Sequence, residues 1–135
     1  MEKKNIKILI VDDDKFLLGM YSLKFSNNGY EVDTTVGSQA ALEKLRNGAK
    51  PDIMLLDVIM PYMDGLELLK TIRTEKLVED AIVVILTNQS QSSDIERAKE
   101  LKVDGYIVKA ATIPSEVLKE VEKIYSAKKG RKISS

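Results

Sequence analysis

The sequence of 135 residues contains no cysteine and no histidine. Without cysteine the chain cannot form disulfides, thiolate nucleophiles or zinc–thiolate sites. Without histidine it also lacks the side chain that most often serves as a general base and as a metal ligand. Any chemistry must therefore use carboxylates, lysine, threonine or tyrosine.

The sequence also lacks a long apolar run and an excess of charge of one sign. No stretch approaches the roughly 20 apolar residues that a membrane-spanning helix needs, and the amino terminus has no signal-peptide pattern. Lys plus Arg and Asp plus Glu number 21 each, so net charge predicts neither nucleic-acid nor membrane binding. We therefore expect a cytoplasmic protein with no membrane partner.

Short apolar runs alternate with segments of helical periodicity along most of the chain. Near-continuous apolar runs favour strands that are covered on both faces, as in a parallel sheet. The segment 30–36 instead alternates apolar and polar side chains, which is typical of an edge strand. The expected strands cover residues 6–11, 30–36, 53–56, 81–86 and 106–108.

Helical periodicity follows each expected strand. The apolar faces are Leu17, Met20 and Tyr21; Ala41, Leu42 and Leu45; Leu66, Leu69 and Ile72; Ile95, Ala98 and Leu101; and Val117, Leu118, Val121, Ile124 and Tyr125. Asp14 and Ser38 are expected N-caps, and Asp64 with Glu67 forms an expected capping box. Five strand–helix units in strict alternation predict an α/β fold, with a parallel sheet covered by helices on both faces.

The expected domain organisation is simple. We assign residues 1–127 to one domain and residues 128–135 to a polar, basic tail that is typical of a solvated chain end. No second domain is visible in the sequence, and in particular no DNA-binding domain.

Polar side chains stand at the carboxyl ends of four expected strands. The first strand leads into Asp12, Asp13 and Asp14, the third into Asp57, the fourth into Thr87 and the fifth into Lys109. The carboxyl ends of parallel strands form the edge where ligands bind in such folds. Asp12, Asp13 and Asp57 would repel one another there, and a hard divalent cation relieves that repulsion. An all-oxygen site with few protein ligands suits Mg²⁺.

A cation beside Asp57 can also hold an incoming phosphoryl group. Lys109 adds a second positive contact and Thr87 a hydrogen-bond donor. Asp57 is then the nucleophile that forms an acyl phosphate. Taken singly, Thr87 is an ordinary strand-end residue, Lys109 suits a surface position and Tyr106 suits edge-strand packing, so the hypothesis depends on their convergence.

Four short motifs give the sequence a specific resemblance. Residues 57–65, Asp-Val-Ile-Met-Pro-Tyr-Met-Asp-Gly, resemble the phosphoacceptor signature D-x-x-M-P-x-M-D-G of response-regulator receivers in two-component signalling. Residues 11–13 resemble the acidic pair of that family, residues 86–87 its switch threonine, and residues 106–109 its aromatic residue and lysine. The resemblance covers about residues 5–126 and points to a single-domain receiver of the chemotaxis-regulator kind.

The resemblance implies roles for the acidic residues. Asp57 is the residue that is phosphorylated. Asp13 and Asp57 bind Mg²⁺ directly, with help from the backbone carbonyl of Ile59. Asp12 takes part in the metal site largely through water.

The resemblance also implies a switch and a topology. Thr87 and Lys109 contact the phosphoryl oxygens, and Tyr106 turns inward on activation. The fold is the flavodoxin-like, doubly wound (βα)5 arrangement, whose five-stranded parallel sheet has the strand order 2-1-3-4-5.

The implied function is Mg²⁺-dependent acceptance of a phosphoryl group on Asp57 from a sensor histidine kinase or a phosphotransfer protein. Phosphorylation then changes binding of a downstream protein on the face formed by the fourth helix, fifth strand and fifth helix. We expect a signalling switch rather than an enzyme, with only self-directed phosphoryl transfer and autodephosphorylation.

Three alternative functions stay open at this point. A degenerate receiver could serve as a constitutive docking module, although intact Asp57 and Lys109 disfavour it. An aspartyl-phosphate phosphatase would commonly carry a second aspartate two residues after the nucleophile, where Ile59 stands. A flavin-binding protein of the flavodoxin kind would need a phosphate-cradling loop after the first strand, where three aspartates repel phosphate.

The sequence departs from the family pattern at three positions. Ala110 follows the lysine where the family usually has proline, and Asn88 follows the threonine where a smaller residue is common. We expect Asn88 to hinder the inward swing of Thr87. Lys102 stands where a glycine usually closes the fourth helix, so a strained cap is expected there.

Overall fold

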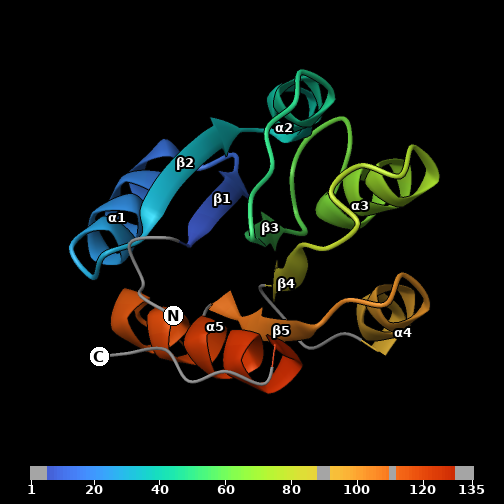
Figure 1. Ribbon diagram of the computed structural model, residues 1–135. Helices are drawn as coiled ribbons and strands as arrows, with labels where there is room; N and C mark the ends of the chain where they lie inside the picture. The colour runs from blue at the N-terminus through green and yellow to red at the C-terminus, as the bar shows by residue number, and fades with distance from the viewer. Residues whose placement is uncertain (1–5, 88–91, 110–111, 130–135) are drawn as a thin grey trace.

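The computed structural model describes residues 6–87, 92–109 and 112–129 of the chain (Figure 1). Within these residues, strands and helices alternate strictly. The strands are β1 (Lys7–Asp12), β2 (Glu31–Val36), β3 (Ile53–Asp57), β4 (Ile82–Thr87) and β5 (Gly105–Val108). The helices are α1 (Lys15–Ser26), α2 (Ser38–Arg46), α3 (Gly65–Thr74), α4 (Ser92–Glu100) and α5 (Pro114–Lys129).

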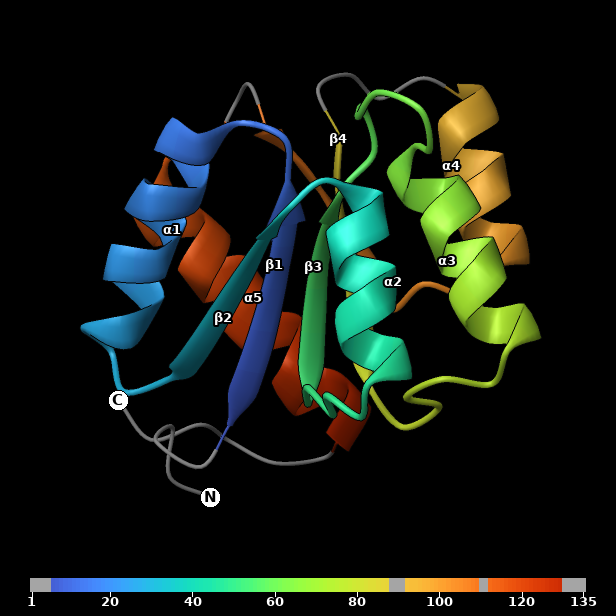
Figure 2. The same ribbon diagram turned by 90° about the horizontal axis from the view of Figure 1, so that it is seen from above.

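The strands form one parallel sheet in the order β2-β1-β3-β4-β5, which confirms the predicted topology. Helices α1 and α5 lie on one face of the sheet, and α2, α3 and α4 lie on the other (Figures 1 and 2). All four pairs of neighbouring strands are parallel, so their carboxyl ends meet at a single edge.

The central strands supply side chains to two separate cores. In β1, Ile8 and Ile10 join the core under α1 and α5, whereas Leu9 and Val11 join the core under α2 and α3. This division explains why β1, β3 and β4 read as continuous apolar runs, since both faces of each strand are buried. The alternating strand β2 lies at the edge of the sheet, as its sequence predicts.

The ends of two helices confirm their predicted caps. The carboxylate of Asp14 accepts hydrogen bonds from the backbone N–H groups of Phe16 and Leu17 at 2.9 and 3.2 Å. Asp64 and Glu67 form the reciprocal capping box of α3. Each cap satisfies N–H groups that the first turn of a helix leaves without partners.

Two details of the helix prediction were wrong. Gly37, not Ser38, is the N-cap of α2, and the Ser38 hydroxyl instead donates to the carbonyl oxygen of Met63 at 2.8 Å. On α1 the buried face includes Tyr21 as expected, but Met20 is 37% exposed. Single-position errors of this kind arise because helical periodicity fixes a face only to within one residue.

Of the three positions that depart from the family pattern, only Lys102 lies within the described residues. Lys102 has a φ of +58°, so the strained cap predicted after α4 is confirmed. Asn88 and Ala110 lie outside the described residues. Helix α5 continues to Lys129, and the domain boundary at residue 127 stays a prediction. None of the described helices has both the length and the apolar character needed to cross a lipid bilayer.

Replacing Lys102 with glycine should stabilise the chain. A side chain at a left-handed backbone position meets steric strain that glycine avoids, so we expect Lys102→Gly to raise the free energy of unfolding by roughly 0.5–1 kcal/mol. Urea denaturation measures this change. The control Lys99→Gly, within α4, should lower stability by about 1 kcal/mol, because glycine is a poor helix former. Equal losses in both variants would contradict the strain.

Candidate functional site

The predicted acidic residues meet at the carboxyl edge of the sheet. Asp12 ends β1 and Asp57 ends β3, and both side chains are buried, whereas Asp13 is exposed. One carboxylate oxygen from each of these three residues lies within 4.8 Å of the other two. The arrangement arises because β1 and β3 are neighbours in register, so their last residues stop side by side.

Lys109 enters this acidic cluster from the end of β5. Its Nζ atom lies 2.8 Å from Asp12 Oδ2 and 3.5 Å from Asp57 Oδ1. The side chain is only 11% exposed, so Lys109 is not a surface lysine. Asp12 is compensated further by the backbone N–H of Asp14, which donates to its Oδ1 at 3.0 Å. Asp12 is therefore the better stabilised of the two buried carboxylates.

Asp57 is the less compensated of the two buried carboxylates. Its Oδ1 atom is buried and has no hydrogen-bond partner among the described residues. Burial and the negative charge of Asp12 raise the pKa of Asp57 to about 7, and Lys109 opposes this rise only in part. Burial would lower the pKa of Lys109, but the hydrogen bond to Asp12 and the charge of Asp57 outweigh it and raise that pKa.

The cluster opens into a pocket of about 450 Å³ between α1, the acceptor loop (residues 58–64) and the start of α5. The pocket is lined by Asp13, Asp14, Leu17, Tyr21, Asp57, Ile59, Lys109, Thr112 and Pro114. The sequence analysis missed Leu17 and Tyr21 as lining residues, since both were assigned only to the core face of α1, and it did not consider Thr112. The direction of helical side chains was the available signal: they point toward the helix amino terminus, which here faces the site.

The acceptor loop folds back closely against Asp57. The N–H of Gly65 donates to the carbonyl of Val58 at 2.9 Å, and the N–H of Val58 donates to the carbonyl of Leu86 at 2.9 Å. A Cβ atom at Gly65 would lie 2.1 Å from the carbonyl oxygen of Asp57, which is a severe clash with backbone. Glycine is thus required here by close approach rather than by a left-handed conformation.

The two expected switch residues lie on neighbouring strands. Thr87 is buried at the end of β4, opposite Val108 in the register with β5. Tyr106 lies opposite Ile85, and its ring is 47% exposed, so in this structure it faces outward. Thr87 directly follows Leu86, the register partner of Asp57. The roles assigned to Thr87 and Tyr106 stay predictions.

The donor set of the cluster fits a small divalent cation. Three carboxylates and the ammonium of Lys109 leave an excess of two negative charges when all four groups are ionised. Oxygen donors suit a hard ion such as Mg²⁺, whose ligands at roughly 2.1 Å are at most about 4.2 Å apart. The three carboxylate oxygens, all within 4.8 Å of one another, are close to that spacing, and a cation would satisfy the Oδ1 atom of Asp57 that lacks a hydrogen bond.

Known sequences that are similar to this chain are those of response regulators. A profile of the response regulator receiver domain matches residues 8–122. The chain is 34% identical over 120 residues to the alkaline phosphatase synthesis transcriptional regulatory protein PhoP of Bacillus subtilis, covering 89% of this chain and 48% of that protein. It is 34% identical over 102 residues to the response regulator SaeR of Staphylococcus aureus, covering 76% of this chain and 43% of SaeR. The chain thus spans less than half of each of these relatives.

Solved structures agree with the sequence comparison. The chemotaxis response regulator CheY4 of Vibrio cholerae superposes with a TM-score of 0.80 at 29% identity, covering 88% of this chain and 98% of that one. The receiver domain of the Francisella response regulator 1452 gives 0.79 at 28% identity, covering 92% and 99%.

The raised pKa of Asp57 predicts how stability depends on pH when no divalent cation is present. Between 3.8, the ordinary value, and about 7, folded Asp57 holds a proton that the unfolded chain has released. The free energy of unfolding should therefore fall as pH rises through this window. Asp57→Asn should remove most of that fall and should be more stable than the wild type above the window.

Urea denaturation in EDTA at about pH 5 and about pH 8 measures the difference. The control is Asp80→Asn, which removes an exposed carboxylate that precedes β4, away from the cluster. Equal pH slopes in the wild type and in Asp57→Asn would contradict the raised pKa.

Proposed function

Because the chain belongs to the response regulator receiver domain family, we propose that it is a phosphorylation switch whose acceptor is Asp57. The phosphoryl donor is a sensor histidine kinase or a phosphotransfer protein of a two-component pathway. The observation that carries the proposal is the buried Asp57 carboxylate, which lines a pocket, lies within ionic contact of Lys109 and has one oxygen without a hydrogen bond.

Transfer begins with the ionised carboxylate of Asp57. Its oxygen forms a bond to phosphorus while the bond from phosphorus to the donor imidazole nitrogen breaks, and the electron pair stays on that nitrogen. Lys109 is proposed to contact the phosphoryl oxygens, and the position of its Nζ, 2.8 Å from Asp12 and 3.5 Å from Asp57, supports this role. The Thr87 hydroxyl is the proposed hydrogen-bond donor to the same oxygens.

Mg²⁺ is the proposed cofactor, held by Asp12, Asp13, Asp57 and the backbone carbonyl of Ile59. When bound, the ion neutralises negative charge on the carboxylates and on the phosphoryl group. The buried cluster supports this assignment through its excess of negative charge. A positive ion next to Asp57 also lowers the pKa of the acceptor, which favours the ionised form that attacks phosphorus.

The signal is proposed to leave through the α4-β5-α5 face. Thr87 moves toward the phosphoryl oxygens, and Tyr106 turns from its exposed position into the space that is vacated. A groove of about 370 Å³ beside Tyr106, lined also by residues of α5 such as Glu116 and Lys119, offers a downstream protein a place to bind on this face. Asn88, which we expect to hinder this movement of Thr87, lies outside the described residues.

The switch is proposed to act without enzymatic turnover of external substrates, apart from its own dephosphorylation. The apolar, 58% exposed Ile59 occupies the place where a phosphatase would carry its second aspartate, which supports this view. The intact acidic cluster and Lys109 disfavour a degenerate docking module. We also propose a cytoplasmic location for the chain. The proposed receiver domain covers residues 1–127, and residues 128–135 form its tail.

Asp57 should be the only residue that becomes phosphorylated. Incubation with acetyl phosphate and Mg²⁺ should add the mass of one phosphoryl group to the intact wild-type chain, because Asp57 alone combines a strand-end position, a buried oxygen without a hydrogen bond and the acceptor motif of residues 57–65. Asp57→Asn should show no gain, and Asp52→Asn, whose carboxylate binds the backbone of Lys7 elsewhere, should label normally. Mass spectrometry reads all three. Labelling of Asp57→Asn at the wild-type level would contradict the assignment.

Mg²⁺ binding should depend on the acidic pair. Asp13→Ala removes an exposed carboxylate of the cluster, so we expect Mg²⁺ affinity to fall by roughly tenfold or more while the fold is kept. Calorimetric titration measures the affinity. Mg²⁺ should also raise the midpoint of thermal unfolding of the wild type, because it binds only the folded cluster. Unchanged affinity in Asp13→Ala would rule out this metal site.

A further inference from the structure

Helix α4 is the most weakly buried helix that the structure describes. Ala98 is its only buried side chain among those described, and most of its other residues are charged. A helix with so narrow an apolar stripe gains little from core packing. Helix α4 is therefore held in place largely by polar contacts.

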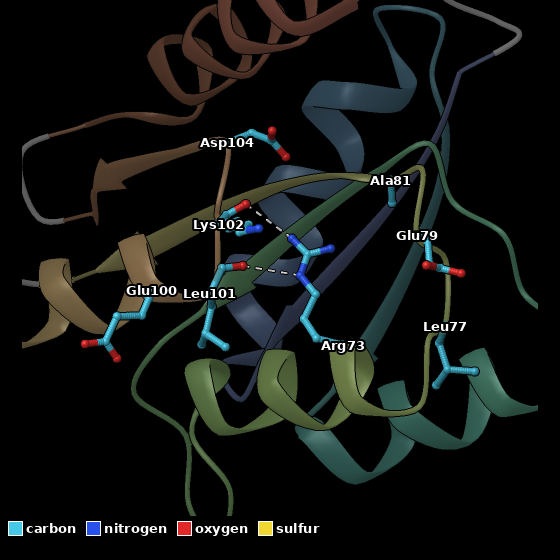
Figure 3. A pocket seen from close by; sticks show the side chains of 8 residues that line it. All are labelled: Arg73, Leu77, Glu79, Ala81, Glu100, Leu101, Lys102 and Asp104. Atoms are coloured by element: carbon cyan, nitrogen blue, oxygen red, sulfur yellow. Dashed lines mark hydrogen bonds between the residues drawn. The ribbon is translucent and has the colours of Figure 1, made fainter.

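The carboxyl end of α4 is firmly attached to its surroundings. Arg73, in the last turn of α3, donates from Nε to the carbonyl of Leu101 and from Nη2 to the carbonyl of Lys102, both at 3.3 Å (Figure 3). Two residues later, Asp104 Oδ2 accepts a hydrogen bond from the N–H of Val83 at 2.7 Å. These contacts anchor the turn between α4 and β5 to both α3 and β4.

The body of α4 is tied to α3 in a different way. Arg97 Nη2 contacts both carboxylate oxygens of Asp64, at 3.3 and 3.1 Å. Among the described residues, this is the only ion pair between α4 and another element, since the Arg97–Asp94 contact lies within the helix. A break in this one pair would leave α4 attached mainly at its carboxyl end, about which it could pivot.

Asp64 connects this pair to the phosphoacceptor. Its carboxylate caps α3, and the next residue, Gly65, packs so closely on the Asp57 carbonyl that no side chain fits between them. The N–H of Gly65 also donates to the carbonyl of Val58 at 2.9 Å, so the backbone beside Asp57 is directly connected to the start of α3. The Asp64 carboxylate that contacts Arg97 therefore belongs to a segment in direct contact with the acceptor.

We propose that Arg97 is a positioning residue that, through Asp64, couples the place of α4 to phosphoryl acceptance at Asp57. The proposal rests on the proposed function and adds a second route to it, which uses neither Thr87 nor Tyr106. In the arrangement described here the pair holds α4 against α3. Phosphoryl acceptance weakens the pair, and by thermodynamic linkage an open pair favours phosphoryl acceptance.

The prediction concerns the rate of labelling by acetyl phosphate with Mg²⁺. Arg97→Gln removes the ion pair, so we expect labelling to accelerate by roughly two- to fivefold, the range expected for a partly exposed pair. Hydrogen exchange of the α4 amides should accelerate in the same variant. Arg97→Lys keeps the positive charge but cannot form the bidentate contact with Asp64, so its labelling rate should lie between the rates of Arg97→Gln and the wild type.

A double-mutant cycle separates coupling from a general loss of stability. Asp64→Ser keeps an N-cap for α3 but removes the carboxylate, so it should accelerate labelling as Arg97→Gln does. The double variant should be no faster than either single one, because both remove the same pair. Arg46→Gln is the matched control, since it breaks an arginine–glutamate pair with Glu75 that does not involve α4, and its rate should equal the wild-type rate.

The possible results distinguish a failure of the coupling from a failure of the proposed function. Multiplying effects in the double variant, or wild-type labelling and exchange rates in Arg97→Gln, would overturn the coupling while leaving the proposed function intact. An equal acceleration in Arg46→Gln would also overturn it, because the effect would then be one of stability. If the wild-type chain itself gains no phosphoryl group, the proposed function fails and the coupling fails with it.

Discussion

The concentration of negative charge at the carboxyl edge of the sheet is the constraint around which the rest of the structure is arranged. Burying a carboxylate is costly unless it is paired, and here two buried carboxylates share a single lysine. Lys109 and the backbone of Asp14 stabilise Asp12 well, whereas Asp57 keeps an oxygen without a hydrogen bond. The apolar strands β1 and β3 hold both groups in place despite their repulsion. The fold thus gives up some stability to keep at this edge a carboxylate oxygen that is open to the proposed cation and phosphoryl group.

The parallel α/β architecture and most of the acidic site could be predicted from local patterns in the sequence, whereas the strand order was implied by the resemblance to the receiver family. Apolar runs mark the buried strands, and parallel strands necessarily bring Asp12, Asp57 and Lys109 to one edge. The contacts of side chains between elements could not be predicted in this way. That Ser38 binds the acceptor loop, or that Arg97 reaches Asp64, depends on helix placement and rotamers, which no periodicity encodes. Nor could the sequence predict that Lys109 Nζ lies closer to Asp12, at 2.8 Å, than to Asp57, at 3.5 Å.

The helices divide into a fixed group and a more loosely held one. Helices α1, α2, α3 and α5 bury apolar stripes in the two cores, and the acceptor loop is bound tightly between β3 and α3. Helix α4 instead depends on arginine contacts with α3. Polar contacts can be exchanged for others at small cost, whereas a packed core resists deformation. Such a division suits the proposed switch, since the packed elements hold the acceptor in place while the weakly buried α4 can exchange its polar contacts.

Gly65 and Lys102 show opposite relations between a residue and its backbone. At Gly65 the surrounding atoms leave no room for a single additional carbon, so tolerance to substitution is set by space and every other amino acid is excluded. At Lys102 the neighbours permit a long side chain, and only the backbone angle is unfavourable, a cost that many residues can bear. Substitution is therefore excluded at residue 65 and only unfavourable at residue 102. Relatives of this chain should thus all keep glycine at residue 65, whereas at residue 102 they should favour glycine but tolerate other residues.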